Sequence, residues 1–218
     1  MSNRPLLPAL RLLLVDDHTI VREGLKRILE STAEGWDITE ESSGFQALDS
    51  LRRARFDLAI VDLSMPGMSG LELIRRIRAE FSPLPVLVLS MHAEDHYALR
   101  ALRAGAAGYV NKESAAEDLS GAVRKVLAGG THVSTRLAET LAKSLRSDTS
   151  RPAHDRLSDR ELEVLRGLAG GKTVKQIGVE LALSEKTVST YRTRLLEKMQ
   201  MHTNAELIQY ALREGLVE

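Results

Sequence analysis

The segment 58–62 has the sequence LAIVD, which is four apolar residues in a row closed by an aspartate. The segment 11–16, RLLLVD, has a similar form, and Asp17 follows it directly. Short runs that are apolar at successive positions are typical of strands buried on both faces of a parallel sheet. The two segments therefore predict buried strands that each end in carboxylates.

Three more short β-branched or leucine-rich runs alternate with amphipathic helical patterns over the first 130 residues. Further strands are expected at 36–40, 86–90 and 108–111, and helices are expected to begin near Thr19, Phe45, Gly70, Asp95 and Ala115. Capping boxes, with Gln or Glu three residues after the cap, mark three of these helix starts at Ser43, Ser69 and Ser114. The pattern predicts an α/β domain with a five-stranded parallel sheet, right-handed crossovers and helices on both faces.

The remainder of the chain carries helical patterns throughout. Glycines at 129 and 130 end the fifth helix, and one helix is expected at 135–145 before a polar, proline-containing stretch. Capping boxes at Ser158, Thr173 and Thr203, with Ser184 as a further N-cap, then predict four short helices. We expect a domain at 9–130, a linker containing one helix at 131–154, and a small all-α domain at 155–217.

Composition excludes several classes of protein. The 218 residues hold 30 basic and 30 acidic side chains, so any nucleic-acid site must be a local basic surface, and six of the basic residues lie within 172–198. The absence of cysteine excludes disulfide scaffolds, thiolate metal sites and cysteine nucleophiles. No apolar run approaches the roughly 18 residues of a membrane helix, so we expect a cytoplasmic protein without a membrane partner.

Carboxylates gather at one edge of the predicted sheet. Asp16 and Asp17 end the first strand and Asp62 ends the third, and ligands of such folds bind beyond the carboxyl ends of the strands. Three converging carboxylates favour a bound cation, and their hard oxygen atoms suit Mg²⁺. Ser90 and Lys112 end the fourth and fifth strands on the same edge, where they can contact a phosphoryl group. In the alternative interpretation the aspartates only cap a helix and begin a turn, and Lys112 is a solvated surface lysine.

These five residues, with DLSMPGMSG at 62–70 and GYVNK at 108–112, resemble the receiver domain of bacterial response regulators over residues 9–130. The resemblance implies the flavodoxin-like strand order 2-1-3-4-5. It also implies that Asp62 is the phosphoacceptor for a sensor histidine kinase. Asp17, Asp62 and the backbone carbonyl of Ser64 would bind Mg²⁺, with Asp16 assisting partly through water.

The same resemblance implies a switch. Lys112 would contact the phosphoryl group, and Ser90 and Tyr109 would be the switch pair. Phosphorylation adds about two negative charges and three acceptor oxygens, by analogy with phosphoserine, so Ser90 would move to bond the group and Tyr109 would swing inward. Tyr109 can equally be a half-buried residue of the sheet. Glu113 follows Lys112, where many receivers have proline.

The segments 173–181 and 184–199 form a helix, a tight turn and a second helix, which would enter the major groove of DNA. Apolar positions at helical spacing should face the core, namely Val188, Tyr191, Leu195 and Met199. The opposite face carries Lys186, Ser189, Thr190 and Thr193, flanked for phosphate contacts by Arg192, Arg194 and Lys198. An ordinary solvated helix face is the alternative.

The segments LSDRELEVL at 157–165, KQI at 175–177 and LSEKTV at 183–188 are similar to the LuxR-type helix-turn-helix. The resemblance implies base contacts from Ser189, Thr190 and Thr193, where many relatives have lysine. It implies phosphate contacts from Lys172, Thr173, Lys175, Lys186, Thr187, Arg192 and Arg194. The last helix, 204–214, would be a dimerisation element or part of the core.

Together the two resemblances identify the chain as a response regulator of the NarL/FixJ type, a transcription factor whose only catalysis is its own phosphotransfer and dephosphorylation. Phosphorylation of Asp62 by a sensor histidine kinase with Mg²⁺ is expected to favour a homodimer on double-stranded promoter DNA, with half-sites about one turn apart. One alternative is an aspartate-based Mg²⁺ phosphatase, which would leave the helix-turn-helix without a role. The other is a phosphorylation-independent DNA-binding regulator whose receiver serves only as a dimerisation module.

Overall fold

The computed structural model describes residues 9–91, 94–146 and 152–217. The chain divides into two compact units, Met1–Lys143 and Ser144–Glu218. The division falls inside a helix, within the segment 131–154 that is predicted as a linker, and residues 147–151 of that segment lie outside the described residues. In the described residues the first unit contains a sheet with helices, and the second contains helices alone.

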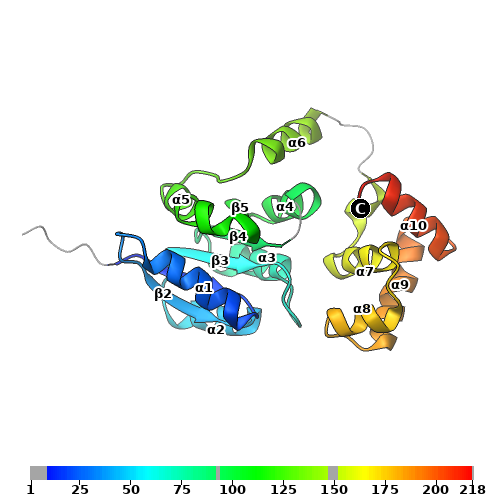
Figure 1. Ribbon diagram of the computed structural model, residues 1–218, viewed down its shortest axis with the longest axis horizontal. Coiled ribbons are helices and arrows are strands. Elements are labelled where there is room, and N and C mark those ends of the chain that lie inside the picture. Colours follow the sequence, from blue (N-terminus) through cyan, green and yellow to red (C-terminus); the bar gives the residue numbers. More distant parts are fainter. Residues whose placement is uncertain (1–8, 92–93, 147–151, 218) are drawn as a thin grey trace, which may run out of the picture. The chain divides into compact units, whose positions relative to one another are not determined.

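Five parallel strands form the sheet of the first unit in the order β2-β1-β3-β4-β5 (Figure 1). The strands are β1 (Arg11–Val15), β2 (Asp37–Glu41), β3 (Leu58–Asp62), β4 (Val86–Ser90) and β5 (Gly108–Asn111). The predicted fold class and strand order are confirmed, although β1 ends one residue earlier than expected and β2 lies one residue later. β3 and β4 are buried along their whole length, which explains why their sequences are almost continuously apolar.

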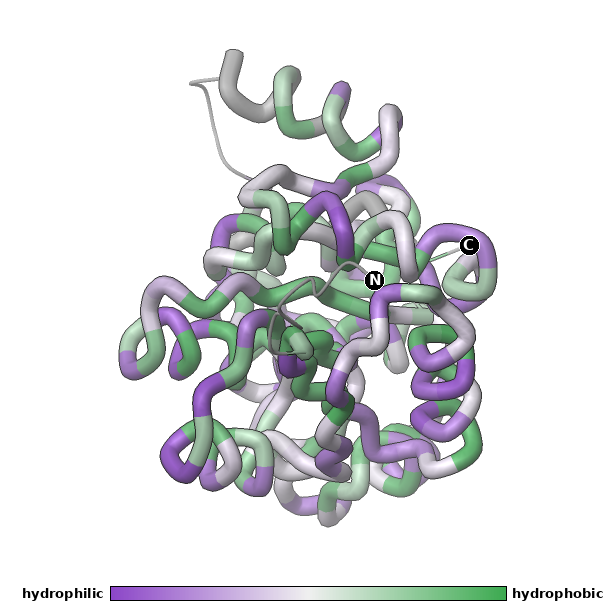
Figure 2. The backbone as a smooth tube through the Cα atoms, turned by 90° about the vertical axis from the view of Figure 1, so that its left-hand side faces the viewer, coloured by the Kyte–Doolittle hydropathy of each residue, from purple (hydrophilic) through white to green (hydrophobic). Residues whose placement is uncertain are grey.

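Helices cover both faces of this sheet. They are α1 (Thr19–Glu30), α2 (Gly44–Arg53), α3 (Gly70–Glu80), α4 (Glu94–Arg103) and α5 (Ala115–Leu127), with a 3₁₀ turn, η1 (Lys112–Ser114), before α5. A sixth helix, α6 (Thr135–Arg146), follows and contains the division between the two units. α1 and α5 contact each other and share a core with alternate residues of the central strands, among them Leu12, Ile60 and Leu89. On the other face α3 contacts α2 and α4. Figure 2 shows the hydrophobic strands inside this helical layer.

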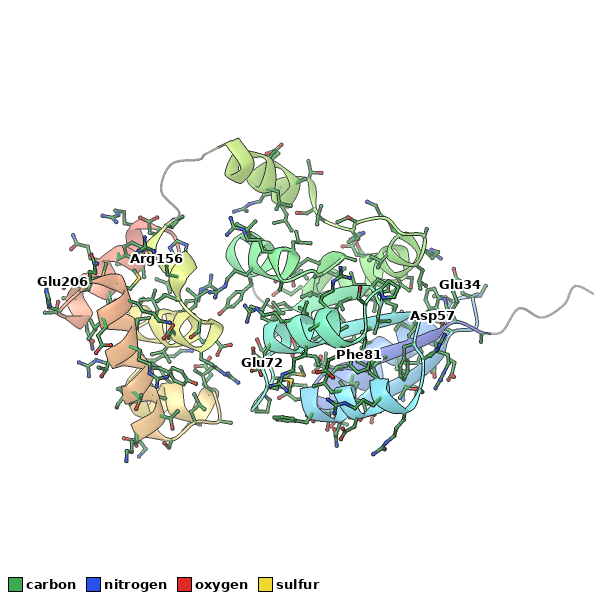
Figure 3. All side chains as sticks on the ribbon, turned by 180° about the vertical axis from the view of Figure 1, so that it is seen from behind. Glu34, Asp57, Glu72, Phe81, Arg156 and Glu206 are labelled. Atoms are coloured by element: carbon green, nitrogen blue, oxygen red, sulfur yellow. The ribbon has the colours of Figure 1, made fainter. Side chains whose placement is uncertain are left out.

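The two ends of β3 lie at opposite ends of the unit. Asp57 precedes β3, and its carboxylate accepts the backbone N–H of Arg11 at 2.7 Å. Glu72 lies in the first turn of α3, after the strand, and Figure 3 shows these two residues well apart. The carboxyl ends of the parallel strands therefore form an edge that is separate from the edge where the strands begin.

The N-caps of the first unit follow the prediction in part. Ser43 and Ser69 each accept a hydrogen bond from the third amide of their helix, but the reciprocal half of the predicted capping boxes is not found in the described residues. The Gln46 side chain accepts the N–H of Ser42 instead, and Glu72 accepts a bond from Arg76. The capping box predicted at Ser114 is wrong, because its hydroxyl makes no cap bond and instead donates to the carbonyl of Asn111 at 3.3 Å. The physical reason is η1, which gives Ser114 a φ of −95° and a ψ of 2° instead of the extended backbone that an N-cap needs.

The second unit contains a 3₁₀ turn and the four predicted helices. The elements are η2 (Ala153–Arg156), α7 (Asp159–Ala169), α8 (Val174–Glu180), α9 (Glu185–Met199) and α10 (Asn204–Arg213). The capping boxes at Ser158, Thr173 and Thr203 are complete, and Ser184 caps α9. α7 contacts α9 and α10, and α8 contacts α9, so α7 and α9 form the centre of the bundle. Within the described residues, no helix is both long enough and apolar enough to cross a membrane.

Candidate functional site

The carboxylates at the ends of β1 and β3 converge. β1 pairs with β3 in a register that sets Val15 opposite Val61, so Asp16 and Asp62 follow at the same level of the sheet. One oxygen from each of Asp16, Asp17 and Asp62, together with a ring nitrogen of His18, all lie within 4.8 Å of one another. Asp16 and Asp62 are almost completely buried, at 0% and 2% exposure. The edge of the sheet therefore holds a compact and largely desolvated acidic cluster.

Lys112 bridges two of these carboxylates. Its Nζ atom lies 2.7 Å from Asp16 Oδ2 and 2.9 Å from Asp62 Oδ2, and the side chain is 6% exposed. Burial acts to lower the pKa of Lys112, but the carboxylates of Asp62 and Asp16 beside it outweigh this effect, so the pKa is raised. The side chain is therefore an ammonium group at neutral pH, and the alternative of a solvated surface lysine is wrong.

Asp62 has an ion-pair partner in Lys112, but within the described residues its carboxylate oxygens lack hydrogen bonds of normal geometry. Burial raises its pKa, the charge of Asp16 adds to the rise, and Lys112 and the backbone amide of Ser64 oppose it. Among the described residues, neither carboxylate oxygen of Asp62 has a hydrogen-bond partner of normal geometry, and neither has Asp17 Oδ1. Buried carboxylate oxygens without hydrogen bonds are costly, and a hard divalent cation is a partner that would satisfy them. The residues present fit an ion such as Mg²⁺.

Close backbone contacts fix both acidic loops. Asp16 donates its N–H to the carbonyl of Glu41 at 3.1 Å and accepts the N–H of His18 on Oδ1 at 2.9 Å. On the other side of the cluster, a Cβ atom at Gly70 would lie 2.1 Å from the carbonyl oxygen of Asp62. Only glycine lets the start of α3 approach the end of β3 so closely. The cluster is thus held from two directions by the main chain.

The remaining predicted residues of this edge differ in exposure. Ser90 is fully buried at the end of β4, where it pairs with Asn111 of β5. Tyr109 is 1% exposed, so its side chain already lies inside the unit, and the alternative of a half-buried residue is wrong. Ser64 is exposed and lies two residues after the end of β3. The roles of these three residues stay predictions.

Two residues of this edge were not predicted. His18 Nδ1 lies 3.1 Å from Asp17 Oδ1 and 3.6 Å from Asp16 Oδ1. The position of His18 in the sequence, directly after Asp16 and Asp17, was a signal that could have placed it at this edge. Arg22, in the first turn of α1, donates from Nη1 to the carbonyl of Asp16 at 2.7 Å. That contact depends on how α1 packs against the sheet, so no local sequence pattern predicts it.

In the second unit, α9 separates an apolar face from a polar one. Val188, Leu195 and Met199 are buried and Tyr191 is half-buried, which confirms the predicted core face. The opposite face is exposed and carries Lys186, Ser189, Thr190 and Thr193. The hydroxyls of Thr190 and Thr193 donate to the carbonyls of Lys186 and Ser189, at 2.9 Å and 3.1 Å. Their methyl groups and oxygen lone pairs are the features that this face offers to a ligand.

The predicted phosphate-contacting residues fall into two groups. The first group, Lys175, Lys186 and Arg194, is exposed, and no hydrogen bond or ion pair of these side chains is found in the part of the chain that the structure describes. The second group is paired with side chains of the same unit: the exposed Lys172 with Glu180 at 2.6 Å, the exposed Lys198 with Glu161 at 2.7 Å, and the half-buried Arg192, whose Nε lies 2.8 Å from Asn204 Oδ1. Thr173 is the N-cap of α8, and Thr187 Oγ1 lies 2.8 Å from the Oγ of Ser184, the N-cap of α9. The second group would have to give up or share these contacts to bind a phosphate.

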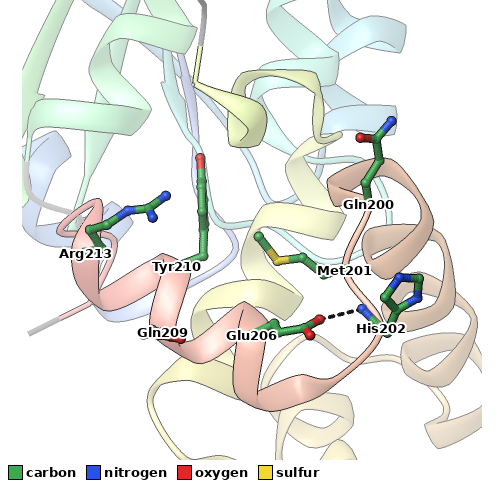
Figure 4. A pocket seen from close by; sticks show the side chains of 7 residues that line it. All are labelled: Gln200, Met201, His202, Glu206, Gln209, Tyr210 and Arg213. Carbon is green, nitrogen blue, oxygen red and sulfur yellow. Dashed lines mark hydrogen bonds between the residues drawn. The ribbon is translucent and has the colours of Figure 1, made fainter.

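A pocket of about 280 Å³ lies beside α10 (Figure 4). It is lined by Gln200, Met201, His202, Glu206, Gln209, Tyr210 and Arg213. Glu206 accepts the backbone N–H of His202 at 2.6 Å, the dashed line in Figure 4. The Tyr210 hydroxyl lies 2.8 Å from Nδ1 of His154, which is buried, and accepts the backbone N–H of His154 at 3.3 Å. This contact, which the sequence did not predict, ties the segment before α7 to α10.

Comparisons with known proteins cover both units. Residues 12–124 match the family described as "Response regulator receiver domain", and residues 155–211 match "Bacterial regulatory proteins, luxR family". The chain is 35% identical to the response regulator UvrY of Escherichia coli (strain K12) over 208 residues, 95% of each chain. It is 35% identical to the response regulator GacA of Pseudomonas aeruginosa over 211 residues, 96% of this chain and 98% of that one. It is also similar to RcsB of Salmonella enterica serovar Typhimurium bound to the promoter rprA in the presence of the phosphomimetic BeF3⁻, with a TM-score of 0.61, 28% identity and coverage of 93% and 98%.

Proposed function

The chain belongs to the response regulators, with a receiver domain followed by a LuxR-type DNA-binding domain, and we propose that phosphorylation of Asp62 in the receiver controls promoter binding by the second domain. The observation that carries the proposal is the Asp62 carboxylate, which is buried, without a hydrogen-bond partner of normal geometry among the described residues, and 2.9 Å from the Lys112 ammonium group. We assign the receiver to residues 9–130, the linker to 131–154 and the DNA-binding domain to 155–217.

Asp62 is the nucleophile toward a phosphohistidine of a sensor histidine kinase. One carboxylate oxygen forms a bond to phosphorus, and the bond between phosphorus and the histidine nitrogen breaks. Lys112 lies beside Asp62 and neutralises part of the charge on the phosphoryl oxygens. Asp17, Asp62 and the carbonyl of Ser64 would hold Mg²⁺, with Asp16 assisting, and the ion would supply further positive charge at the phosphoryl group. The chain catalyses nothing beyond this transfer and the later hydrolysis.

The phosphoryl group then acts through Ser90 and Tyr109. Phosphorylation gives Asp62 about two negative charges and three strong acceptor oxygens. Ser90 donates its hydroxyl hydrogen to one of them, and Tyr109, which is buried on β5, adjusts its packing in response. The surface formed by α4 and β5 changes with it, because these elements pack together. This change favours a homodimer.

The DNA-binding domain places the polar face of α9 in the major groove. RcsB, whose chain is similar over both domains, is bound to DNA in several solved structures, and in two of them the DNA is a promoter. Ser189, Thr190 and Thr193 would contact base edges. The phosphate contacts come from Lys172, Thr173, Lys175, Lys186, Thr187, Arg192, Arg194 and Lys198. Since promoter DNA lies in the cytoplasm, the protein acts there.

Intact mass spectrometry after incubation with Mg²⁺ and acetyl phosphate tests the receiver half of the proposal. The wild type should gain one phosphoryl group and a larger dimer fraction, and Asp62→Ala should gain neither. The matched control is Asp118→Ala, which removes an exposed aspartate of α5 and should leave both results unchanged. A phosphoryl group on Asp62→Ala would show that another residue is the acceptor.

DNA binding separates the main proposal from a receiver that serves only as a dimerisation module. Asp62→Ala should lose the phosphate-dependent increase in affinity while keeping basal binding. If wild type and Asp62→Ala bind promoter DNA equally after acetyl phosphate treatment that phosphorylates the wild type, the module interpretation is correct. Within the second domain, Arg192→Ala should weaken binding to all sequences and reduce the salt slope by about 1, whereas Thr190→Ala should change sequence preference.

A further inference from the structure

Arg22 connects the acidic cluster to the neighbouring strand. Its Nη1 atom donates to the carbonyl oxygen of Asp16 at 2.7 Å, and its Nε atom lies 3.3 Å from Oε2 of Glu40 on β2. The side chain is only 13% exposed, so its aliphatic part and its charge are both largely removed from water. Nε forms no hydrogen bond in the described part of the chain, so the contact with Glu40 is an ion pair, and the bond to Asp16 is the one hydrogen bond. A largely buried guanidinium group held by these two partners acts as a brace between them, because the group is planar and rigid.

The bond to Asp16 acts on a specific peptide group. The carbonyl of Asp16 belongs to the peptide that joins Asp16 to Asp17, so its orientation determines the direction in which the Asp17 side chain leaves the backbone. The N–H of Asp16 is already held by Glu41, and its Oδ1 atom is held by the N–H of His18. Arg22 adds the third contact and completes the fixation of the residue between the two strands.

We propose that Arg22 is a positioning residue for the divalent-cation site, and that it acts by fixing the peptide between Asp16 and Asp17 so that both carboxylates point into the cluster with Asp62. This inference rests on the proposed function, which includes that cation site. A second observation points to the same ligand, since the buried oxygens of Asp62 have no hydrogen-bond partner of normal geometry among the described residues. Groups that orient metal ligands without touching the metal typically change affinity by roughly 10- to 100-fold when they are removed.

If Arg22 acted through its charge alone, its removal would have the opposite effect on metal affinity. A cation close to three carboxylates repels an incoming Mg²⁺ or Mn²⁺ ion, so its removal alone should tighten metal binding. Loss of the brace should weaken metal binding, because the carboxylates would no longer be held in place. The sign of the change in affinity therefore decides between a positioning role and a purely electrostatic one.

Lys26 provides a matched control on the same helix. Its Nζ atom lies 2.7 Å from Oε1 of Glu40, so it shares the carboxylate that Arg22 approaches. It is one helical turn further along α1, and in the described part of the chain no bond joins it to the loop of Asp16 and Asp17. Lys26→Met removes a charge and an ion pair from this group of residues without removing the brace.

The test measures Mn²⁺ binding from the loss of the free-ion signal in electron paramagnetic resonance, with Mg²⁺ added as competitor, for the full-length wild type, Arg22→Met, Arg22→Lys and Lys26→Met. We expect Arg22→Met to weaken binding of both ions by roughly 10- to 100-fold. Arg22→Lys should lie in between, because a lysine keeps the charge but cannot span both partners. Lys26→Met should bind as tightly as the wild type or slightly tighter.

Urea unfolding without metal, followed by the fluorescence of Trp36, shows whether each variant is folded. If Arg22→Met does not fold, Arg22→Lys decides, and wild-type affinity in a folded Arg22→Lys would overturn the inference. Equal or tighter binding by a folded Arg22→Met would overturn it as well, and so would an equal loss in Arg22→Met and Lys26→Met. If the wild type itself binds neither ion, the cation site of the proposed function is wrong. If the wild type binds and the variant binds equally well, only the role of Arg22 is wrong, so the two failures can be told apart.

Discussion

Replacing Asp62 by asparagine is expected to stabilise the receiver in the absence of divalent cations. The change keeps the shape of the side chain and removes a buried charge that has two carboxylates and one ammonium group beside it. With an effective dielectric constant of about 20, each carboxylate within 4.8 Å repels Asp62 by at least about 3.5 kcal/mol. The Lys112 ammonium group at 2.9 Å attracts it by about 6 kcal/mol.

The repulsions therefore slightly exceed the attraction, and the cost of burying the charge adds to them. We expect Asp62→Asn to increase the free energy of unfolding by about 1–3 kcal/mol at pH 7 without metal. The pKa of Asp62 is raised in the folded state, so the wild type loses stability as the pH rises from the usual carboxyl pKa through the raised value. The advantage of the variant should consequently disappear in acid, where the carboxyl group is protonated in both states.

Urea unfolding in EDTA, followed by fluorescence, measures this difference. Trp36 is the single tryptophan of the chain and is 7% exposed in the receiver core, so it reports this domain alone. Asp118→Asn, at an exposed position of α5, is the matched control and should change nothing. Saturating Mg²⁺ should stabilise the wild type more than Asp62→Asn, because binding to the folded state adds to its stability. An Asp62→Asn variant no more stable than wild type in EDTA at pH 7 would refute the electrostatic argument.

Three further changes test other parts of the structure. Gly70→Ala should destabilise the receiver by about 1–3 kcal/mol in urea unfolding, because the added Cβ atom would lie 2.1 Å from a backbone carbonyl oxygen. Gly121→Ala, on α5 with open space around it, should stabilise the receiver by about 0.5–1 kcal/mol. Tyr210→Phe should lower the stability of the DNA-binding domain by about 1 kcal/mol in thermal unfolding followed by circular dichroism, because it loses the hydroxyl contact with a buried histidine. Glu161→Gln should destabilise the same domain at pH 7. Burial acts to raise the pKa of Glu161, but the hydrogen bonds from Lys198 and from the N-cap of α7 outweigh it, so the pKa is lowered. The difference in stability should therefore vanish as the pH falls through this lowered pKa.

The fold was predictable because its signals are local. Strands β1, β3 and β4 are runs of mostly apolar residues, and the capping boxes at Ser158, Thr173 and Thr203 lie where the helices begin. β2, with the sequence DITEE, carries a weaker signal. Ser114 shows the limit of such signals, since its sequence fits a capping box and a 3₁₀ turn overrides it. The box needs an extended backbone at the cap, and that depends on how β5 leads into α5.

The candidate site was predictable where residues end strands, and less so where they meet across the fold. Asp16, Asp62 and Lys112 follow from strand ends alone, because parallel strands bring those ends together. Arg22 and the pair of His154 and Tyr210 depend on contacts between different elements, and the latter two residues are 56 positions apart. Nothing in the periodicity of either segment indicates which partner it will have.

The two faces of α9 have a consequence for how this regulator can acquire new targets. Ser189, Thr190 and Thr193 are exposed, and the bonds that Thr190 and Thr193 make are to the carbonyls of their own helix. Val188 and Leu195, on the opposite side of the helix, are buried in the core of the domain. Exchanges on the exposed face should therefore alter promoter choice at almost no cost to folding, so duplicated copies of such a gene could diverge in their targets through single substitutions while the scaffold stays the same.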